Sequence, residues 1–293
     1  MQSTLFDAEF MRKLETLRLL ARKVFRSPSQ GERTTLRRGS SLEFTDYRRY
    51  HPGDDFRYID WNVYSRLDRL FLKVFSAEED LTIHLLIDAS QSMHFGAPPK
   101  LDYARRVAAA LGYIGLNNLD RVGVVAFADE LGTPMPPQRG RQQIFAMFRY
   151  FEALQSQGGT NLNRVLSSYA RRSTKTGLAI VVSDLFDANG YESGLDALAY
   201  GNFDVLLIQL VDEAEINPQF DGALRLHDIE STLQRRLTVN RRMLALYRQK
   251  IAEYFAQIET FCAKRNIEYL RASTVVPFED LVLQYLRRGF YLH

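Results

Sequence analysis

The sequence predicts an α/β protein in which a mostly parallel sheet is covered by helices on both faces. The apolar runs LTIHLLID at residues 81–88 and LAIVVS at residues 178–183 are continuous rather than alternating, which is typical of strands buried on both faces. Stretches with helical spacing of apolar residues separate such runs, as the connections between parallel strands require. An N-terminal helix and a small β-containing segment are expected to precede this sheet.

The N-terminal part is expected to span residues 1–79. A helix is predicted there because one helical face collects the apolar side chains of Phe10, Leu14, Leu17, Ala21 and Val24. We expect this helix to pack on the protein's own body or on a partner, with a position on a membrane surface as a less favoured alternative. Residues 27–35, SPSQGERTT, are predicted to form a loop. A strand follows near residues 70–75, where Leu70, Leu72 and Val74 alternate with Phe71, Lys73 and Phe75.

The α/β domain is expected to span residues 80–293. Its first strand, 81–88, leads into an Ala-rich amphipathic helix at 100–118 and then into the strand RVGVVAF at 121–127. Helices are predicted at 141–155, which carries Ile144, Phe145, Phe148 and Phe151, and at 162–172. Strands at 177–183, 203–211 and 267–272 then alternate with helices at 193–200, 237–265 and 278–287. An insertion at about 212–265 begins with a polar stretch that is expected to include a small hairpin.

Composition excludes several classes of protein. The 293 residues carry a formal net charge of +3, which is too small to indicate a nucleic-acid binder. The single cysteine, Cys262, rules out an internal disulfide and a cysteine-rich zinc site, and we expect it to be a small core residue in a reducing compartment. No apolar run approaches the roughly 20 residues that a membrane span needs, and acidic residues near the N-terminus argue against a signal or transit peptide. A cytoplasmic protein is therefore expected.

Oxygen-bearing side chains follow two strands and open one helix of the predicted sheet. They occur in DASQS at residues 88–92, in GGTN at residues 158–161 and at Asp184, directly after a strand. Since ligands of parallel sheets gather beyond the carboxyl ends of the strands, these side chains are expected to meet at one edge. Each has an alternative explanation, because Asp, Ser and Thr are common at helix N-caps, and Thr160 is a good cap for the helix that follows.

Taken together, these residues form a set of three hydroxyls and two carboxylates. Two carboxylates that converge without a cation would repel each other and raise their pKa values. Ligation by oxygen alone suits Mg²⁺ or Mn²⁺, with Ca²⁺ as a further candidate. The predicted metal site comprises Asp88, Ser90, Ser92, Thr160 and Asp184.

The order DASQS, then GGT, then SD after a strand resembles the metal-ion-dependent adhesion site of von Willebrand factor A domains. The resemblance implies the fold of a von Willebrand factor A domain. It also implies that the serines, and in one state the threonine, contact the ion, while the aspartates act mostly through water. Neutral direct ligands leave the ion much of its positive charge, so that a carboxylate from another protein can complete its shell. A partner that supplies an acidic residue is therefore expected, and no enzymatic activity.

The segment SLEFTDYRRYHPGDDFRYIDWN at residues 41–62 resembles the signature of the bacterial family called domain of unknown function 58. The matching elements are Glu43-Phe44, Arg48, Tyr50, Pro52-Gly53-Asp54-Asp55, Arg57, Ile59-Asp60-Trp61 and Arg66. The resemblance runs from about residue 37 to the last strand and implies a partnership with a MoxR-class AAA+ ATPase in chaperone-like or complex-assembly work. Ion pairs between its aspartates and arginines are expected, with Trp61 and Tyr58 as apolar anchors. The segment is either a structural layer or a docking surface.

Other functions remain as alternatives. A metal-dependent phosphatase or hydrolase would use Asp88 as nucleophile, but Ser90 stands where a second aspartate would be expected, and Lys264 is a weak candidate for its lysine. A nucleic-acid adaptor would use arginine pairs, which do not form a stripe. No P-loop, H-E-x-x-H or G-x-S-x-G motif occurs. The histidines do not cluster; His84 is expected in the core, and His94 could line the rim of the site. The arginine pairs are Arg37-Arg38, Arg171-Arg172, Arg235-Arg236 and Arg241-Arg242.

Overall fold

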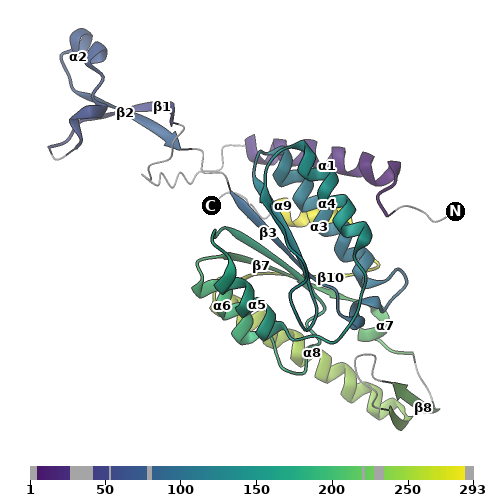
Figure 1. The fold of residues 1–293 in the computed structure, drawn as a ribbon. Coiled ribbons are helices and arrows are strands. Elements are labelled where there is room, and N and C mark those ends of the chain that lie inside the picture. Colours follow the sequence, from purple (N-terminus) through teal and green to yellow (C-terminus); the bar gives the residue numbers. More distant parts are fainter. Residues whose placement is uncertain are drawn as a thin grey trace. The chain divides into compact units, whose positions relative to one another are not determined.

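The structure, a computed structural model, describes residues 5–26, 42–52, 54–77, 81–219, 222–227 and 234–287 (Figure 1). The chain divides into two compact units. One is formed by residues 1–27 together with 81–292, and the other by residues 28–80. Several residues singled out above lie outside the described part, namely Arg37, Arg38 and Gly53, as do the side chains of Val24, Glu43, Phe44, Val74, Phe75, Arg235 and Arg236. The N-terminal helix was expected to share one segment with the signature at 1–79, whereas the structure places it in the α/β unit.

The α/β unit is built on a six-stranded sheet with the order β10-β7-β6-β3-β4-β5. Five strands are parallel and the edge strand β5 is antiparallel to β4, which confirms the predicted mostly parallel sheet. Strand β5 was not predicted, because the sequence MPPQ contains two prolines, and prolines in a sheet are restricted to edges such as this one. The strands are β3 (Thr82–Asp88), β4 (Arg121–Phe127), β5 (Met135–Gln138), β6 (Leu178–Ser183), β7 (Asp204–Val211) and β10 (Glu268–Ser273).

Helices cover both faces of this sheet, as predicted (Figure 1). Neighbouring residues of one strand point to opposite faces, so Leu85 of β3 belongs to one hydrophobic cluster and Leu86 to the other. The first cluster includes α1 (Ala8–Arg26), α3 (Lys100–Asn117), α4 (Arg141–Ala153) and α9 (Phe278–Arg287). The second cluster includes α5 (Leu162–Arg172), α6 (Glu192–Tyr200) and α8 (Arg241–Lys264). No helix in the described ranges combines the length and the hydropathy that a bilayer crossing needs.

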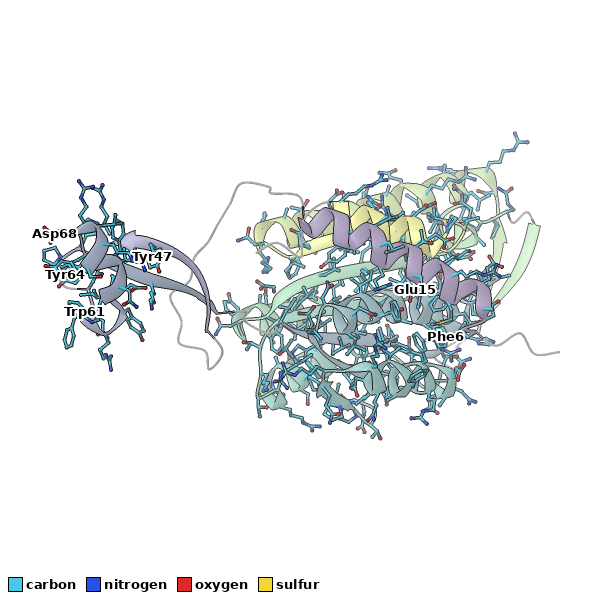
Figure 2. The ribbon with its side chains drawn as sticks, turned by 90° about the horizontal axis from the view of Figure 1, so that it is seen from above. Phe6, Glu15, Tyr47, Trp61, Tyr64 and Asp68 are labelled. Atoms are coloured by element: carbon cyan, nitrogen blue, oxygen red, sulfur yellow. The ribbon has the colours of Figure 1, made fainter. Side chains whose placement is uncertain are left out.

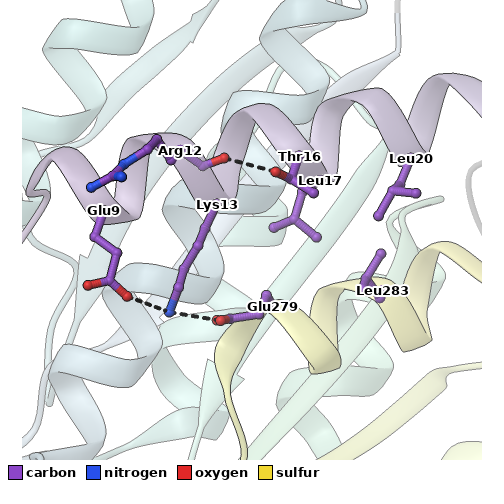
Figure 3. Close-up of a pocket in the computed structure, with 8 residues that line it drawn as sticks. All are labelled: Glu9, Arg12, Lys13, Thr16, Leu17, Leu20, Glu279 and Leu283. Carbon is purple, nitrogen blue, oxygen red and sulfur yellow. Dashed lines mark hydrogen bonds and ion pairs between the residues drawn. The ribbon is translucent and has the colours of Figure 1, made fainter.

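Helix α1 packs on the α/β unit through its predicted apolar face. Phe10, Leu14, Leu17 and Ala21 are buried in the first cluster. Lys13 lies at the side of this face, where its ammonium group is 2.8 Å from Glu279 of α9 and 3.3 Å from Glu9 (Figure 3). These residues line a shallow groove of about 460 Å³ between α1 and α9. Of the positions that the sequence left open for this helix, the structure therefore favours packing on the protein's own body.

Residues 212–265 form a short helix, a hairpin and a long helix. Helix α7 (Glu213–Ile216) precedes the antiparallel strands β8 (Gly222–His227) and β9 (Gln234–Val239), which form the expected hairpin slightly later in the chain than predicted. The second half of α8 packs on the sheet through Phe255, Ile258 and Cys262, which confirms Cys262 as a core residue. Burial raises the pKa of the Cys262 thiol to about 12. Residues 241–250, the first half of α8, are almost entirely exposed.

The second unit contains most of the family signature. Strands β1 (Leu42–Arg49) and β2 (Phe71–Ala77) pair antiparallel and enclose a 3₁₀ turn, Phe56–Tyr58, and helix α2 (Trp61–Leu67). The expected ion pairs form between Arg48 and Asp54 and between Arg57 and Asp55, both at 2.6 Å. Trp61, predicted to be an apolar anchor, is 61% exposed, so it does not anchor this unit's own core; its side chain can be followed in Figure 2.

Asp60 connects helix α2 of this unit to both strands. One carboxylate oxygen accepts hydrogen bonds from the backbone N–H groups of Asn62 and Val63, at 2.9 and 3.2 Å, and so caps the helix. The other oxygen accepts from the Tyr47 hydroxyl at 2.9 Å and lies 3.0 Å from the Lys73 ammonium group. The hydrogen bond from Lys73 lowers the pKa of Asp60 to about 2. The partner of Asp60 is thus a lysine rather than one of the predicted arginines.

Replacing Asp60 by Asn should loosen the second unit. Because the folded-state pKa of about 2 lies below the ordinary 3.8, the stabilisation is present above pH 3.8 and lost as the pH falls towards 2. At pH 7 the variant should exchange the backbone amides of residues 54–73 roughly fivefold faster or more, because Asn can still cap the helix but loses the ion pair with Lys73 and weakens the bond from Tyr47. Hydrogen exchange of the full chain, followed by mass spectrometry, measures this. Asp68→Asn is the matched control, since Asp68 ends the same helix with a positive φ of 50°, which Asn also tolerates. Equal exchange in Asp60→Asn and wild type would contradict the prediction.

Candidate functional site

The three predicted loops meet beyond the carboxyl ends of β3, β4 and β6. Strand β3 lies between β4 and β6, so Asp88 at its end faces loops from both neighbours. The backbone N–H of Gln91 donates to the carbonyl of Gly158 at 3.0 Å, and that of Gln157 donates to the carbonyl of Ala89 at 2.8 Å. These bonds hold the 88–92 loop against the 157–161 loop.

Asp88 is completely buried at the centre of this loop cluster. One carboxylate oxygen accepts from the backbone N–H of Ser90 at 2.9 Å, an Asx-type turn that a strand ending in Asp-x-Ser favours. The other oxygen accepts from the Ser183 hydroxyl at 2.6 Å. Ser183 was not singled out from the sequence, because a serine at the end of an apolar strand gives no local signal of its partner.

The two serines of the 88–92 loop turn their hydroxyls towards each other. The Oγ atoms of Ser90 and Ser92 lie 3.0 Å apart, and Ser90 is fully buried. Ser90 occupies the cap position of the 3₁₀ helix Gln91–His94, but its side chain makes no capping hydrogen bond. Capping, the alternative explanation for this serine, therefore does not account for its position. His94, a candidate for the rim, is exposed.

Thr160 is buried in the neighbouring loop, with 9% of its surface exposed. The sequence left open that Thr160 caps the helix after it, but the structure gives this role to Asn161, whose side chain accepts from the backbone N–H of Arg164 at 3.0 Å. Leu162 donates its backbone N–H to Asp187 at 2.7 Å, which satisfies another group at the start of this helix. The capping explanation for Thr160 is thus wrong.

Asp184 follows β6 and is buried beside Asp88. One carboxylate oxygen accepts from the backbone N–H of Phe186 at 3.0 Å. The other accepts from the ammonium group of Lys100 at 2.7 Å. Gln209 of the neighbouring strand donates to the backbone carbonyl of Asp184 at 3.0 Å, which holds this turn in place.

Lys100 was not recognised as a site residue from the sequence, which placed it only at the start of a helix. Its side chain is completely buried, and its ammonium group lies between Asp184 and Glu215 of α7, at 2.7 and 2.5 Å. The rings of Phe186 and Phe95 lie 5.5 and 5.9 Å from it. One signal was available, because a lysine in the first turn of a helix opposes the helix dipole, which favours anions there.

The buried charges of this cluster do not balance. Asp88, Asp184 and Glu215 carry three negative charges when ionised, against the single positive charge of Lys100. Burial, reinforced by the nearby Asp184, raises the pKa of Asp88 to about 7, although hydrogen bonds from Ser183 and Ser90 oppose this. Burial also raises the pKa of Glu215. Burial alone would lower the pKa of Lys100, but Asp184 and Glu215 outweigh it and raise that pKa.

This donor set fits a hard divalent cation. Two adjacent hydroxyls and a buried carboxylate with a raised pKa are oxygen donors of the kind that Mg²⁺ or a similar ion binds. In the described part of the chain, no three His, Cys, Asp or Glu side chains are grouped so as to hold a metal ion. An ion at this place would therefore depend on hydroxyl oxygens, from Ser90, Ser92 and Thr160, for part of its shell.

A groove of about 630 Å³ opens beside these loops. Ala89 and Gly158, which flank the candidate ligands, line one side of it, and Asp129 and Glu130 line another. The groove therefore lies next to the 88–92 loop.

The fold and the cluster define an α/β protein that carries hydroxyl and carboxylate side chains at the carboxyl edge of a parallel sheet. The chain belongs to the family described as Protein of unknown function DUF58, whose model matches residues 46–257. Uncharacterized proteins of Mycobacterium tuberculosis and Mycobacterium bovis are 27% identical over 239 residues, which cover 80% of this chain and 75% of each relative.

Two solved structures have a backbone that partly superimposes on that of this chain. The conserved hypothetical protein BatB from Bacteroides thetaiotaomicron has a TM-score of 0.44 and 15% identity, and an aerotolerance-related membrane protein from Bacteroides fragilis has a TM-score of 0.43 and 16% identity. Each comparison covers 71% of this chain and 99% of the other. Similarity at this level carries no inference about function.

Replacing Asp88 by Asn should stabilise the metal-free protein. In EDTA at pH 8, the substitution removes a buried carboxylate that has no cation, so the melting temperature should rise by roughly 2–5 °C. Asp184→Asn is the control of opposite sign, because it removes the partner of the buried Lys100 and should lower the melting temperature. Differential scanning fluorimetry measures both. A lower melting temperature for Asp88→Asn than for wild type would show that the Asp88 charge is already compensated.

Proposed function

We propose that this protein is a non-enzymatic, metal-dependent protein-interaction module. Asp88, Ser90, Ser92, Thr160 and Asp184 would hold Mg²⁺ or Mn²⁺, with Ca²⁺ as a further candidate, and the ion would bind an acidic residue of a partner protein. The observation that carries this proposal is the pair of facing serine hydroxyls beside a buried carboxylate whose pKa is raised by burial and by the nearby Asp184.

The ligand types suit recognition rather than catalysis. Hydroxyl ligands are neutral, so a divalent ion would keep much of its charge and would attract a carboxylate from outside. Asp88 would contribute a negative charge from a fully buried position, where both of its oxygens already accept hydrogen bonds. A carboxylate in this state is poorly placed to attack a substrate, since a nucleophile has to reach the reacting atom.

A metal-dependent phosphatase or hydrolase remains the second candidate. Lys100 is a buried lysine beside Asp184 and could take the role for which the sequence offered only Lys264. Because Asp88 is buried and fully hydrogen-bonded, we rank this function below the interaction module. Hydrolysis of p-nitrophenyl phosphate by purified protein that disappears in Asp88→Asn would reverse the ranking.

The partner is proposed to be a MoxR-class AAA+ ATPase, in chaperone-like or complex-assembly work, because that is what the family signature implies. The exposed first half of α8 supports an acidic partner. Residues 241–250 include four basic residues and no acidic one, and they also expose Met243 and Leu246. The hydroxyl of Tyr247 donates to the carbonyl of Glu215 at 2.6 Å, which connects this basic surface with the residue that holds Lys100.

Divalent ions should stabilise the wild-type protein. Mg²⁺ at a hundredfold excess over its Kd should add about 2.7 kcal/mol to the free energy of unfolding by mass action. For a unit of this size the melting temperature should rise by roughly 5–10 °C. Scanning fluorimetry with Mg²⁺ and with EDTA measures the shift. Ser92→Ala should reduce the shift by at least half, whereas Ser168→Ala on α5 should keep it. Identical curves with Mg²⁺ and EDTA would remove the basis of the proposal.

Capture of the MoxR-class ATPase of the same organism should depend on both the ion and α8. Purified ATPase should bind the immobilised full chain in Mg²⁺ and at least tenfold less in EDTA. Reversing two charges, in Arg241→Glu with Arg248→Glu, should weaken binding several-fold more at low salt than at high salt, because the contact is electrostatic.

Arg171→Glu with Arg172→Glu is the matched control for this charge reversal, since these exposed arginines end α5. The control should bind the ATPase as the wild type does. Equal capture with Mg²⁺ and with EDTA would contradict an ion-mediated contact, and equal loss in both double variants would contradict the assignment of α8.

A further inference from the structure

We propose that Lys100 is the fixed counter-ion of Asp184 and sets how tightly the site holds a divalent cation, with Glu215 acting in the opposite direction. This inference rests on the metal site proposed above and adds two residues to it. Neither lies in the Asp-x-Ser-x-Ser, Thr and Asp pattern from which the site was predicted.

The buried position of Lys100 lowers the stability of the protein unless its charge is compensated. The ammonium group is removed from water entirely, and burying an unpaired ammonium would cost several kcal/mol. It also lies in the first turn of α3, where the helix dipole disfavours a cation. Asp184 and Glu215 compensate both costs, at 2.7 and 2.5 Å. An apolar residue with no carboxylates around it would have filled the same space without these costs.

Lys100 changes what Asp184 offers to an ion. Both carboxylate oxygens of Asp184 already accept a hydrogen bond, one from Lys100 and one from the backbone N–H of Phe186. The negative charge of Asp184 is thus largely neutralised inside the protein. The remaining donors, Asp88 with the hydroxyls of Ser90 and Ser92, carry one negative charge between them. An ion held by these groups keeps a net positive charge, which is the condition for attracting a partner's carboxylate.

Glu215 is the second carboxylate that contacts Lys100, and it is held in place by its own helix. It belongs to the capping box of α7. The Glu215 side chain accepts a hydrogen bond from the backbone N–H of Asp212, and the Asp212 side chain accepts from the backbone of the first turn of the helix. The carbonyl of Glu215 accepts from Tyr247 of α8. The charge of Lys100 is therefore shared between the candidate metal site and the segment that carries the hairpin and α8. Removing the Glu215 charge would leave Lys100 to act on the site with less compensation.

The two residues should have opposite effects on metal affinity. Lys100→Met removes a positive charge next to the site, so Mg²⁺ should bind at least tenfold more tightly than to wild type. Glu215→Gln keeps the shape and removes a negative charge, so Mg²⁺ should bind at least threefold more weakly. Isothermal titration calorimetry of the full chain with MgCl₂ gives both dissociation constants, and near-ultraviolet circular dichroism checks that each variant is folded.

The opposite signs distinguish this proposal from a merely structural role, which would weaken binding in both variants. Equal or weaker Mg²⁺ binding by folded Lys100→Met would overturn it. If Lys100→Met does not fold, Glu215→Gln decides alone, and unchanged or tighter binding there would overturn the proposal. Failure of the metal site itself is seen separately, because wild type would then give no binding heat with MgCl₂.

Discussion

The buried ion pair between Lys100 and Asp184 is the interaction on which the rest of the site depends. It joins the start of α3 to the turn after β6, two segments that are 84 residues apart in the chain. Through Glu215 it also reaches α7 and, from there, α8. A buried ammonium requires hydrogen-bond acceptors and an opposite charge, and a buried carboxylate requires a donor or a cation. Each group therefore restricts where its neighbours can be.

The parallel sheet supplies the frame for this cluster. Strand β3 lies in the interior of the sheet, between β6 and β4, so its last residue is surrounded by the loops of both neighbours. The loops are tied together by backbone hydrogen bonds, from Gln91 to Gly158 and from Gln157 to Ala89, which do not depend on the identity of their side chains. The backbone can thus hold hydroxyl and carboxylate side chains together at the edge of the sheet, whatever those side chains contribute to stability.

The family signature has a different physical role from the cluster. Asp60 caps α2 and contacts both strands of the second unit, while Arg48 and Arg57 pair with Asp54 and Asp55. These contacts stabilise the second unit itself. Its most prominent aromatic side chains, Phe56 and Trp61, are 69% and 61% exposed, which is unusual for a segment that only fills a core. The charged residues of the signature thus account for its local structure, to which the exposed aromatic side chains contribute little burial.

Local information was sufficient for most of the elements and for the loops in which the five candidate ligands lie. Helix α5 at 162–172, strand β4 at 121–127 and helix α9 at 278–287 have the predicted bounds, because apolar periodicity and turn residues act within a few residues of one another. The loops that carry Asp88, Thr160 and Asp184 were placed by the rule that parallel strands end at one edge. The edge strand β5 was missed because its prolines conceal it.

Only the tertiary structure decided how the charges of the site are balanced. Ser183, Lys100 and Glu215 come from a strand end, a helix start and an insertion, and no local pattern shows that they meet. The same holds for Asn161, which took the capping role that Thr160 could equally have filled. A sequence determines which groups can be charged or hydrogen-bonded, but the pairing of buried charges depends on distances between segments far apart in the chain, because desolvation makes each buried group dependent on whichever partner the fold brings to it.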